Sequence, residues 1–167
     1  NNTISNLNSQ ISNCEYQISQ LNSEIRNKQS QINELNQLKN KYQKLQSDFA
    51  DRQSGRLNSF NSNFSGNLRV NFMSSYVTGM RSLLSGSEYR NAYNGIGAAI
   101  STISNKIKAI EREIDDLNRN INSRQTTINN CRRDINIYQN QKAREFSNLS
   151  YRRQRITYWK NQLRYAR

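Results

Sequence analysis

Apolar residues recur every seven positions in the first part of the chain. Isoleucine occupies one row of this repeat, and leucine or cysteine usually follows three positions later. Such alternating spacing is an a/d heptad, which predicts a long helix that packs along one stripe against another helix. The first row is Ile4, Ile11, Ile18, Ile25 and Ile32, and the second row is Leu7, Cys14, Leu21, Lys28 and Leu35.

The repeat is expected to change phase after Leu35. The next apolar residue, Leu38, comes only three positions later. The apolar series then resumes as Tyr42, Leu45 and Phe49. Two successive three-residue steps form a stammer, which overwinds a coiled coil locally. The sequence therefore predicts that the seam of the first helix shifts near its far end.

A second and longer heptad segment occupies the later half of the chain. Before it, residues 52–67 are rich in Ser, Asn and Gly, which predicts a loop centred on residues 63–66. The apolar residues after that loop follow helical spacing and predict a short helix, where either Gly86 ends this helix or Ser87 caps the next one. The rows of the second segment are Ile100, Ile107, Ile114, Ile121, Ile128 and Ile135, and Ile103, Ile110, Leu117, Arg124, Cys131 and Tyr138.

These two segments, joined by a central turn, predict an all-α fold built as a long antiparallel coiled-coil helical hairpin. Pairing opposite rows gives a register in which Ile11 faces Cys131 and Lys28 faces Ile114. A slipped register that brings Lys28 beside Arg124 would place two like charges in the seam, which is unfavourable. We expect a hairpin domain over residues 1–146, with arms over 4–50 and 87–146 and a turn with a short extra helix over 52–86, followed by a basic, aromatic C-terminal helical tail over 147–167.

The composition favours long thin helices over a compact globule. Hydrophobic residues make up 34% of the 167 residues and the mean hydropathy is −1.00, which leaves little apolar surface for a large core. Proline is absent and only six glycines occur, whereas loop-rich folds need more turn residues. No apolar stretch approaches the roughly 20 residues that cross a membrane, so we expect no membrane span. The N-terminus shows no signal-peptide pattern. The first residue is Asn and not Met, which is compatible with a leader that has been removed.

The net charge is +13, and the C-terminal end holds more than half of it. From Lys142 to Arg167, eight Lys and Arg side chains accompany one acid, which gives a net charge of +7. This basic and aromatic segment fits a nucleic acid, an anionic membrane surface or a helix of a protein partner, and composition leaves these open beside a solubilising role. The candidate polyanion contacts are Arg152, Arg153, Arg155, Lys160 and Arg164.

Catalytic chemistry has little support in this sequence. The absence of His removes the commonest general base and the commonest metal ligand. The acids within residues 111–116 fall on different faces of a helix among Lys and Arg, as expected for surface ion pairs. Gly95-Ile96-Gly97 follows no strand pattern, so close helix packing explains it better than a dinucleotide-binding loop. We therefore expect a protein that is not an enzyme and has no cofactor or metal.

The two cysteines, Cys14 and Cys131, both fall on the seam, in adjacent layers of the expected register. They are interpreted either as two small buried apolar residues or as a disulfide near the open ends of the hairpin. A disulfide that closes so long a loop would stabilise the fold by roughly 4–5 kcal/mol in the chain-entropy model. It would also indicate an oxidising compartment. The sequence leaves both interpretations open.

The order of heptad arm, Ser/Asn/Gly-rich turn, short helix and second heptad arm resembles the WXG superfamily. Within it, the chain is most similar to the small helical proteins encoded beside LXG toxins in Gram-positive type VII secretion systems. A Trp-x-Gly turn links the helical arms in that family. Phe64-Ser65-Gly66 stands at the matching place here, with Phe in the position of Trp. The resemblance covers roughly residues 4–146.

The resemblance implies a function in secretion. It implies that the chain binds the helical N-terminal domain of an LXG toxin, with or without a second small helical protein, in the bacterial cytoplasm before export to the outside or the cell surface. Two alternatives remain: a basic coiled coil that binds nucleic acid or another polyanion, and a structural coiled-coil subunit of a larger assembly. The expected partner interface consists of apolar residues beyond those that a two-helix seam needs: Phe60, Phe72, Met73, Tyr76, Met80, Leu83 and Leu84.

Overall fold

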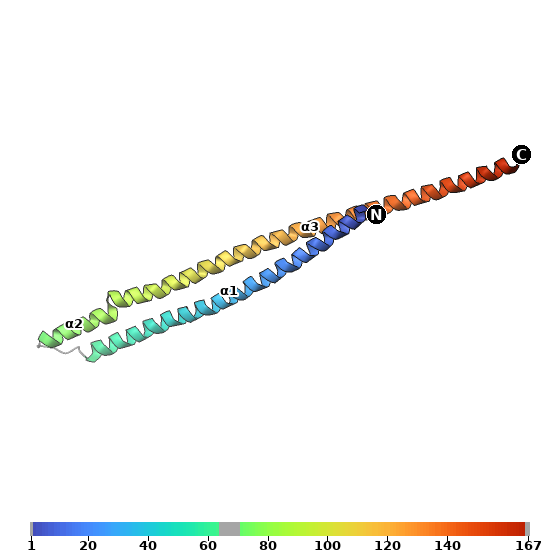
Figure 1. Ribbon diagram of the computed structural model, residues 1–167. Coiled ribbons are helices and arrows are strands. Elements are labelled where there is room, and N and C mark those ends of the chain that lie inside the picture. Colours follow the sequence, from blue (N-terminus) through green and yellow to red (C-terminus); the bar gives the residue numbers. More distant parts are fainter. Residues whose placement is uncertain (1, 64–70, 166–167) are drawn as a thin grey trace. The chain divides into compact units, whose positions relative to one another are not determined.

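The structure, a computed structural model, describes residues 2–63 and 71–165, which form three helices (Figure 1). Among these residues only Gly86 is not helical, and no strand occurs. The predicted all-α fold is therefore confirmed. Within the same residues, no helix combines the length and the apolar character needed to cross a membrane. The helices are α1 (Asn2–Asn63), α2 (Asn71–Ser85) and α3 (Ser87–Tyr165).

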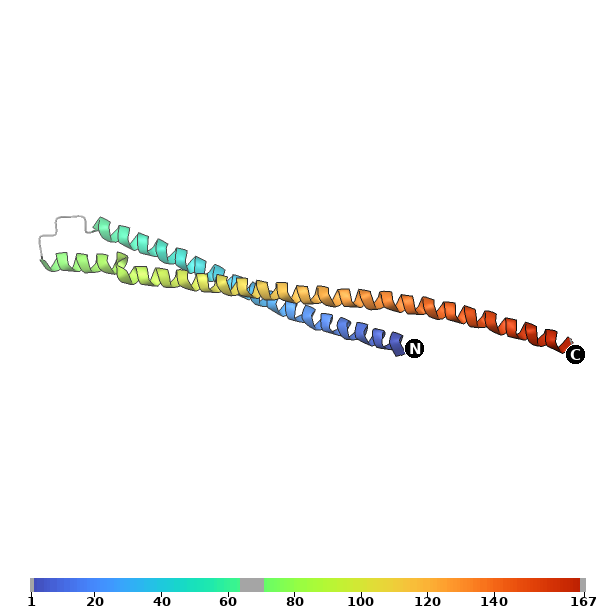
Figure 2. The same cartoon turned by 90° about the horizontal axis from the view of Figure 1, so that it is seen from above.

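Contacts between residues divide the chain into two units. The first unit combines α1 up to Glu24 with α3 from Asp116 onward, and the second unit covers Ile25–Asp115 with α2. In each unit the segments of α1 and α3 run antiparallel, and in the second unit α2 runs antiparallel to the end of α1 (Figures 1 and 2). The helical hairpin expected from the two heptad segments is thus the observed topology.

The first unit is held together by one apolar seam between α1 and α3. Ile128 is only 2% exposed and Cys131 is also buried, while Ile11 and Ile18 of α1 are half-buried. The thiol of Cys131 lies 3.5 Å from Oε1 of Gln10, the residue before Ile11. This contact agrees with the expected register, in which Ile11 faces Cys131.

Polar side chains also join the two helices of the first unit. Arg132 of α3 forms an ion pair with Glu15 of α1 at 3.2 Å. Arg124, which takes a seam position, donates a hydrogen bond from Nη1 to Oε1 of Gln17. Its Nε is buried and has no hydrogen-bond partner among the residues that the structure describes. A buried donor left unsatisfied in this way costs about 1–3 kcal/mol of stability.

We expect the substitution Arg124→Leu to raise the free energy of unfolding by about 1–2 kcal/mol. Leucine fills the seam position with apolar surface and removes the buried, unpaired Nε. Urea unfolding followed by circular dichroism measures the change. The matched control is Arg133→Leu, an exposed position of the same helix, where we expect little effect. A lower stability of Arg124→Leu would show that the guanidinium stabilises the seam.

In the second unit, the predicted stammer after Leu35 is wrong. Leu38 and Leu45 are exposed, whereas the residues that continue the first row at seven-residue spacing are half-buried or buried. On α3, three isoleucines of the expected rows are buried in this unit: Ile103, Ile107 and Ile110. The first row of α1 therefore runs on without a phase change, through Lys39, Gln46, Gln53 and Phe60.

Hydrogen bonds explain how polar residues occupy this row. Nε2 of Gln46 donates to the carbonyl oxygen of Tyr93 at 3.3 Å, and Nε2 of Gln53 donates to the carbonyl oxygen of Leu84 at 2.7 Å. Buried polar groups are tolerated when they are hydrogen-bonded. Gln46 and Gln53 therefore occupy the seam row, although a hydrophobicity pattern assigns the seam of this stretch to Leu38 and Leu45.

Lys28 takes its seam position through an ion pair. Its ammonium nitrogen lies 2.6 Å from Oε2 of Glu113, the neighbour of Ile114, which the expected register places opposite Lys28. The hydrogen bond from Lys28 and its positive charge hold the pKa of Glu113 below its ordinary value of 4.5, and nearby Lys106 acts in the same direction. Glu113 therefore stays ionised near neutral pH and compensates the lysine.

The first helix is longer than expected. α1 continues to Asn63, so the predicted loop over residues 52–67 is wrong for residues 52–63. Leu57 is half-buried and Phe60 is buried, and Nε of Arg81 in α2 donates to Oδ1 of Asn61 at 3.2 Å. These contacts outweigh the weak helix propensity of the Ser, Asn and Gly residues in this stretch.

Candidate functional site

The corner between α2 and α3 is built around Gly86. Its carbonyl oxygen accepts a hydrogen bond from the backbone N–H of Arg90 at 3.2 Å. Gly86, rather than Ser87, is therefore the N-cap of α3. A Cβ at Gly86 would lie 1.9 Å from the carbonyl oxygen of Ser82, so no other residue fits without movement of the backbone.

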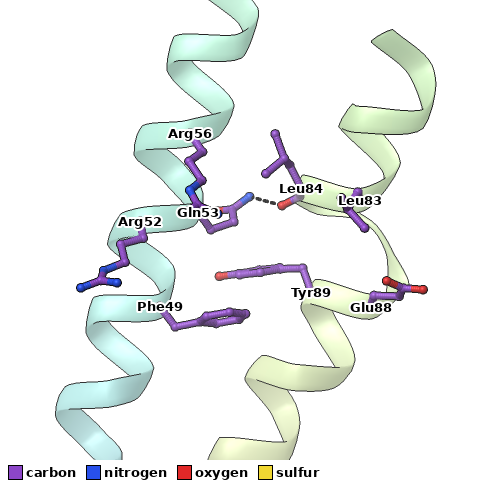
Figure 3. Close-up of a pocket in the computed structure, with 8 residues that line it drawn as sticks. All are labelled: Phe49, Arg52, Gln53, Arg56, Leu83, Leu84, Glu88 and Tyr89. Atoms are coloured by element: carbon purple, nitrogen blue, oxygen red, sulfur yellow. Dashed lines mark hydrogen bonds between the residues drawn. The ribbon is translucent and has the colours of Figure 1, made fainter. Parts of the chain in front are cut away.

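Two side chains bind the carbonyl groups at the end of α2. Gln53 of α1 donates to the carbonyl oxygen of Leu84, as the dashed line in Figure 3 shows. Arg90 of α3 donates from Nη1 to the carbonyl oxygen of Ser85 at 3.4 Å. The last carbonyl groups of a helix have no partner within that helix, so these bonds satisfy them. They also tie all three helices to the corner.

Aromatic rings stiffen the contact between α1 and α3 beside the corner. The rings of Phe49 and Tyr89 are stacked, with centroids 5.1 Å apart and planes at 15°, and both lie between the two helices in Figure 3. The ring of Tyr93 also stacks on the ring of Tyr89, with a centroid distance of 6.0 Å. Such stacking adds about 0.5–1.5 kcal/mol beyond simple burial.

Two neighbouring cavities open at this corner, with volumes of about 440 Å³ and about 600 Å³. Both cavities are lined by Arg52, Arg56, Leu83 and Leu84, so they form one groove between the end of α1, α2 and the first turn of α3. Leu83 is 54% exposed and offers an apolar contact in this corner groove. The groove therefore combines apolar surface with two guanidinium groups.

The expected partner-interface residues differ widely in exposure. Phe60 is 8% exposed and, together with Val77, belongs to the core of the second unit, so the chain itself already covers it. Tyr76 and Leu83 are exposed. Half-buried residues are Met73, Met80 and Leu84. The turn residues Phe64, Ser65 and Gly66 and the side chain of Phe72 lie outside the described part of the structure.

An exposed apolar surface on α1 was not predicted from the sequence, because Leu38 and Leu45 were assigned to the seam. Both side chains are exposed and stand seven residues apart on one row of the helix. Arg52, the next position of this row, lines the corner groove. Continuing the seven-residue spacing of the isoleucines beyond Ile32 would have placed Leu38 and Leu45 off the seam. This α1 row therefore presents exposed apolar side chains next to the groove.

The chemistry of the groove suits binding. Its lining groups are guanidinium, amide, aromatic and aliphatic, and Glu88 adds a carboxylate to the smaller cavity. Over the residues that the structure describes, no cluster of side chains could hold a metal ion. Apolar contacts with charge-assisted hydrogen bonds at their edge are typical of surfaces that bind another protein.

Both cysteines are free thiols in the structure, Cys14 half-buried and Cys131 buried. The seam of the first unit therefore packs around them without a disulfide, as two small apolar residues.

The candidate polyanion contacts all lie on the last part of α3, where every described side chain from residue 136 to residue 164 is exposed. The guanidinium carbon of Arg155 lies 5.9 Å from the ring centroid of Tyr151. Tyr158 and Trp159 meet edge to face, with centroids 5.4 Å apart. The contacts that the sequence singled out, all on this segment, are Arg152, Arg153, Arg155, Lys160 and Arg164.

Comparisons with protein-family models, with curated proteins and with solved structures found no match to this chain.

Proposed function

We propose that the protein is a non-enzymatic adaptor that binds the helical N-terminal domain of an LXG toxin for type VII secretion. The observation that carries this proposal is the apolar surface that the second unit leaves exposed, at Leu38 and Leu45 of α1 and at Tyr76 and Leu83 of α2. Rows of exposed apolar side chains favour a helical partner that lies alongside. The resemblance to the small LXG-associated proteins suggests which partner this is.

The geometry suggests how the partner binds. A helix that lies along the α1 row would cover Leu38 and Leu45 and reach the corner groove at Arg52. A large apolar side chain of the partner would enter the groove beside Leu83, and Arg52 and Arg56 would pair with acidic groups at its edge. Two helical hairpins that meet in this way form a helical bundle, which buries the apolar rows of both.

Co-expression with the N-terminal domain of an LXG toxin encoded by an adjacent gene tests the proposal. We expect a complex that stays together through size-exclusion chromatography. The double variant Leu45→Gln and Leu83→Gln should weaken binding at least about tenfold, because each leucine loses burial worth about 1.5–3 kcal/mol. Both side chains are exposed, so the free variant should fold normally, which circular dichroism checks.

The matched control is Ile137→Gln, an equally exposed apolar residue in the first unit, which should bind like the unaltered chain. Failure to form any complex with the toxin domain would overturn the proposal. A complex that the Leu45 and Leu83 substitutions leave unaffected would overturn the assigned surface.

A further inference from the structure

We infer that the C-terminal part of α3 is a second docking surface, which binds an acidic amphipathic helix of a partner protein as a continuation of the hairpin seam. This tail stripe consists of Leu149, Ile156, Trp159 and Leu163, all of them exposed. It belongs to the first unit, whereas the corner groove belongs to the second. The inference therefore goes beyond the adaptor function proposed above.

The tail stripe continues the seam rows of α3 without a change of phase. Ile128 and Ile135 belong to the row that packs in the first unit, and after Lys142 the same seven-residue spacing leads to three apolar residues. Trp159 lies four heptads after Cys131 on the second row. The apolar residues that resume the first row are Leu149, Ile156 and Leu163. The helix face that packs on α1 therefore runs on into the tail.

In the described part of the chain, the seam rows of α3 are exposed after Ile135. Figures 1 and 2 show α3 continuing past the N-terminal end of α1. Within the described residues, Ile135 is half-buried, but each later residue of its row is exposed. Among the described residues, this stretch of the seam rows is therefore left exposed.

The charges beside the tail stripe select an acidic partner. In the paired part of the seam, Arg132 flanks the apolar rows and forms its ion pair with Glu15 of α1 at 3.2 Å. Arg153 and Lys160 hold the same flanking position three and four heptads later, and both are exposed. Charges at such flanking positions decide which helices pair. A helix with acids there would repeat the Arg132–Glu15 contact twice.

Two other occupants fit this surface less well. A second copy of the chain would bring together two segments that each carry a net charge of +7 from Lys142 to Arg167, which opposes pairing. A nucleic acid would bind the cations and stack on aromatic rings, but it would not bury a heptad row of leucine and isoleucine. The spacing and the charge together therefore favour a helix.

Trp159 gives a direct measurement, because it is the only tryptophan of the chain and is 56% exposed within the stripe. The probe is a synthetic peptide of about four heptads with Ile and Leu on its seam rows and Glu at its flanking positions. The matched peptide carries Lys in place of Glu. The Glu peptide should bind the full chain and shift Trp159 emission to shorter wavelength, and the Lys peptide should bind at least about tenfold more weakly.

Three sets of variants separate the apolar and the charged contributions. Ile156→Asn with Leu163→Asn should weaken binding of the Glu peptide at least about tenfold. Tyr151→Asn, an equally exposed residue off the stripe, is the control and should not change it. Arg153→Glu with Lys160→Glu should reverse the preference, so that the Lys peptide binds more tightly.

Equal binding of the two peptides, or no shift of Trp159 emission, would overturn the inference. So would tighter binding of a duplex DNA of about two helical turns, or self-association of the free chain that the Ile156 and Leu163 substitutions abolish. These variants leave Leu45, Leu83 and the corner groove untouched. The outcome is therefore independent of the test of toxin binding.

Discussion

Replacing Ile128 by alanine is expected to lower the free energy of unfolding by about 3 kcal/mol. Ile128 is fully buried in the seam of the first unit. The substitution removes apolar contact and leaves a cavity, which the surrounding side chains fill only partly because two helical backbones hold them apart. Urea unfolding followed by circular dichroism measures the loss.

The matched control is Ile137→Ala in the same helix, where the side chain is 47% exposed. Both variants gain the same helix propensity when alanine replaces isoleucine, so their difference isolates the effect of burial. We expect the control to change stability by no more than about 0.5 kcal/mol. Equal effects of the two substitutions would mean that Ile128 does not face α1, and the register of the first unit would be incorrect.

The helices, their antiparallel pairing and their register followed from the isoleucine rows. A seven-residue apolar repeat indicates which face of a helix is buried. Two such faces in one chain pair most simply as an antiparallel hairpin. The contact of Cys131 with Gln10 and the ion pair of Lys28 with Glu113 both lie one residue from the expected layers. Periodicity was therefore sufficient for the topology.

The far end of the first helix could not be predicted in the same way. Gln46 and Gln53 stand on the seam row because each finds a backbone carbonyl group across the interface, at Tyr93 and at Leu84. The first acceptor lies in α3 and the second at the end of α2, and a local hydrophobicity pattern of α1 contains no information about either. Assigning the apolar Leu45 to the seam was the consequence.

The tail shows a related limit of sequence reasoning. Its basic composition suggested a separate segment from residue 147, whereas α3 is one helix from Ser87 to Tyr165. Lys142, Glu145 and Arg152 take three of the row positions in this part of α3, and these charges hid the continuation of the rows. The heptad spacing, followed across the charged positions, reveals the tail stripe.

The corner groove depends on Gly86, and the substitution Gly86→Ala is expected to lower the free energy of unfolding by about 2–3 kcal/mol. The new Cβ would lie 1.9 Å from the carbonyl oxygen of Ser82. That oxygen belongs to the backbone of α2 and cannot rotate away, so the corner must open. Opening it strains the hydrogen bond from Gln53 to Leu84 and the stack of Phe49 on Tyr89.

Gly95→Ala is the matched control, because a Cβ at Gly95 meets no atom within 4 Å. In the interior of a helix, alanine replacing glycine should raise stability by about 0.5–1 kcal/mol. Replacing glycine by alanine is therefore expected to lower the free energy of unfolding at Gly86 and to raise it at Gly95. Thermal unfolding of the two variants measures this difference. If Gly86→Ala also stabilised the protein, α2 and α3 would form one continuous helix, and the groove proposed to receive the toxin domain would lose its structural basis.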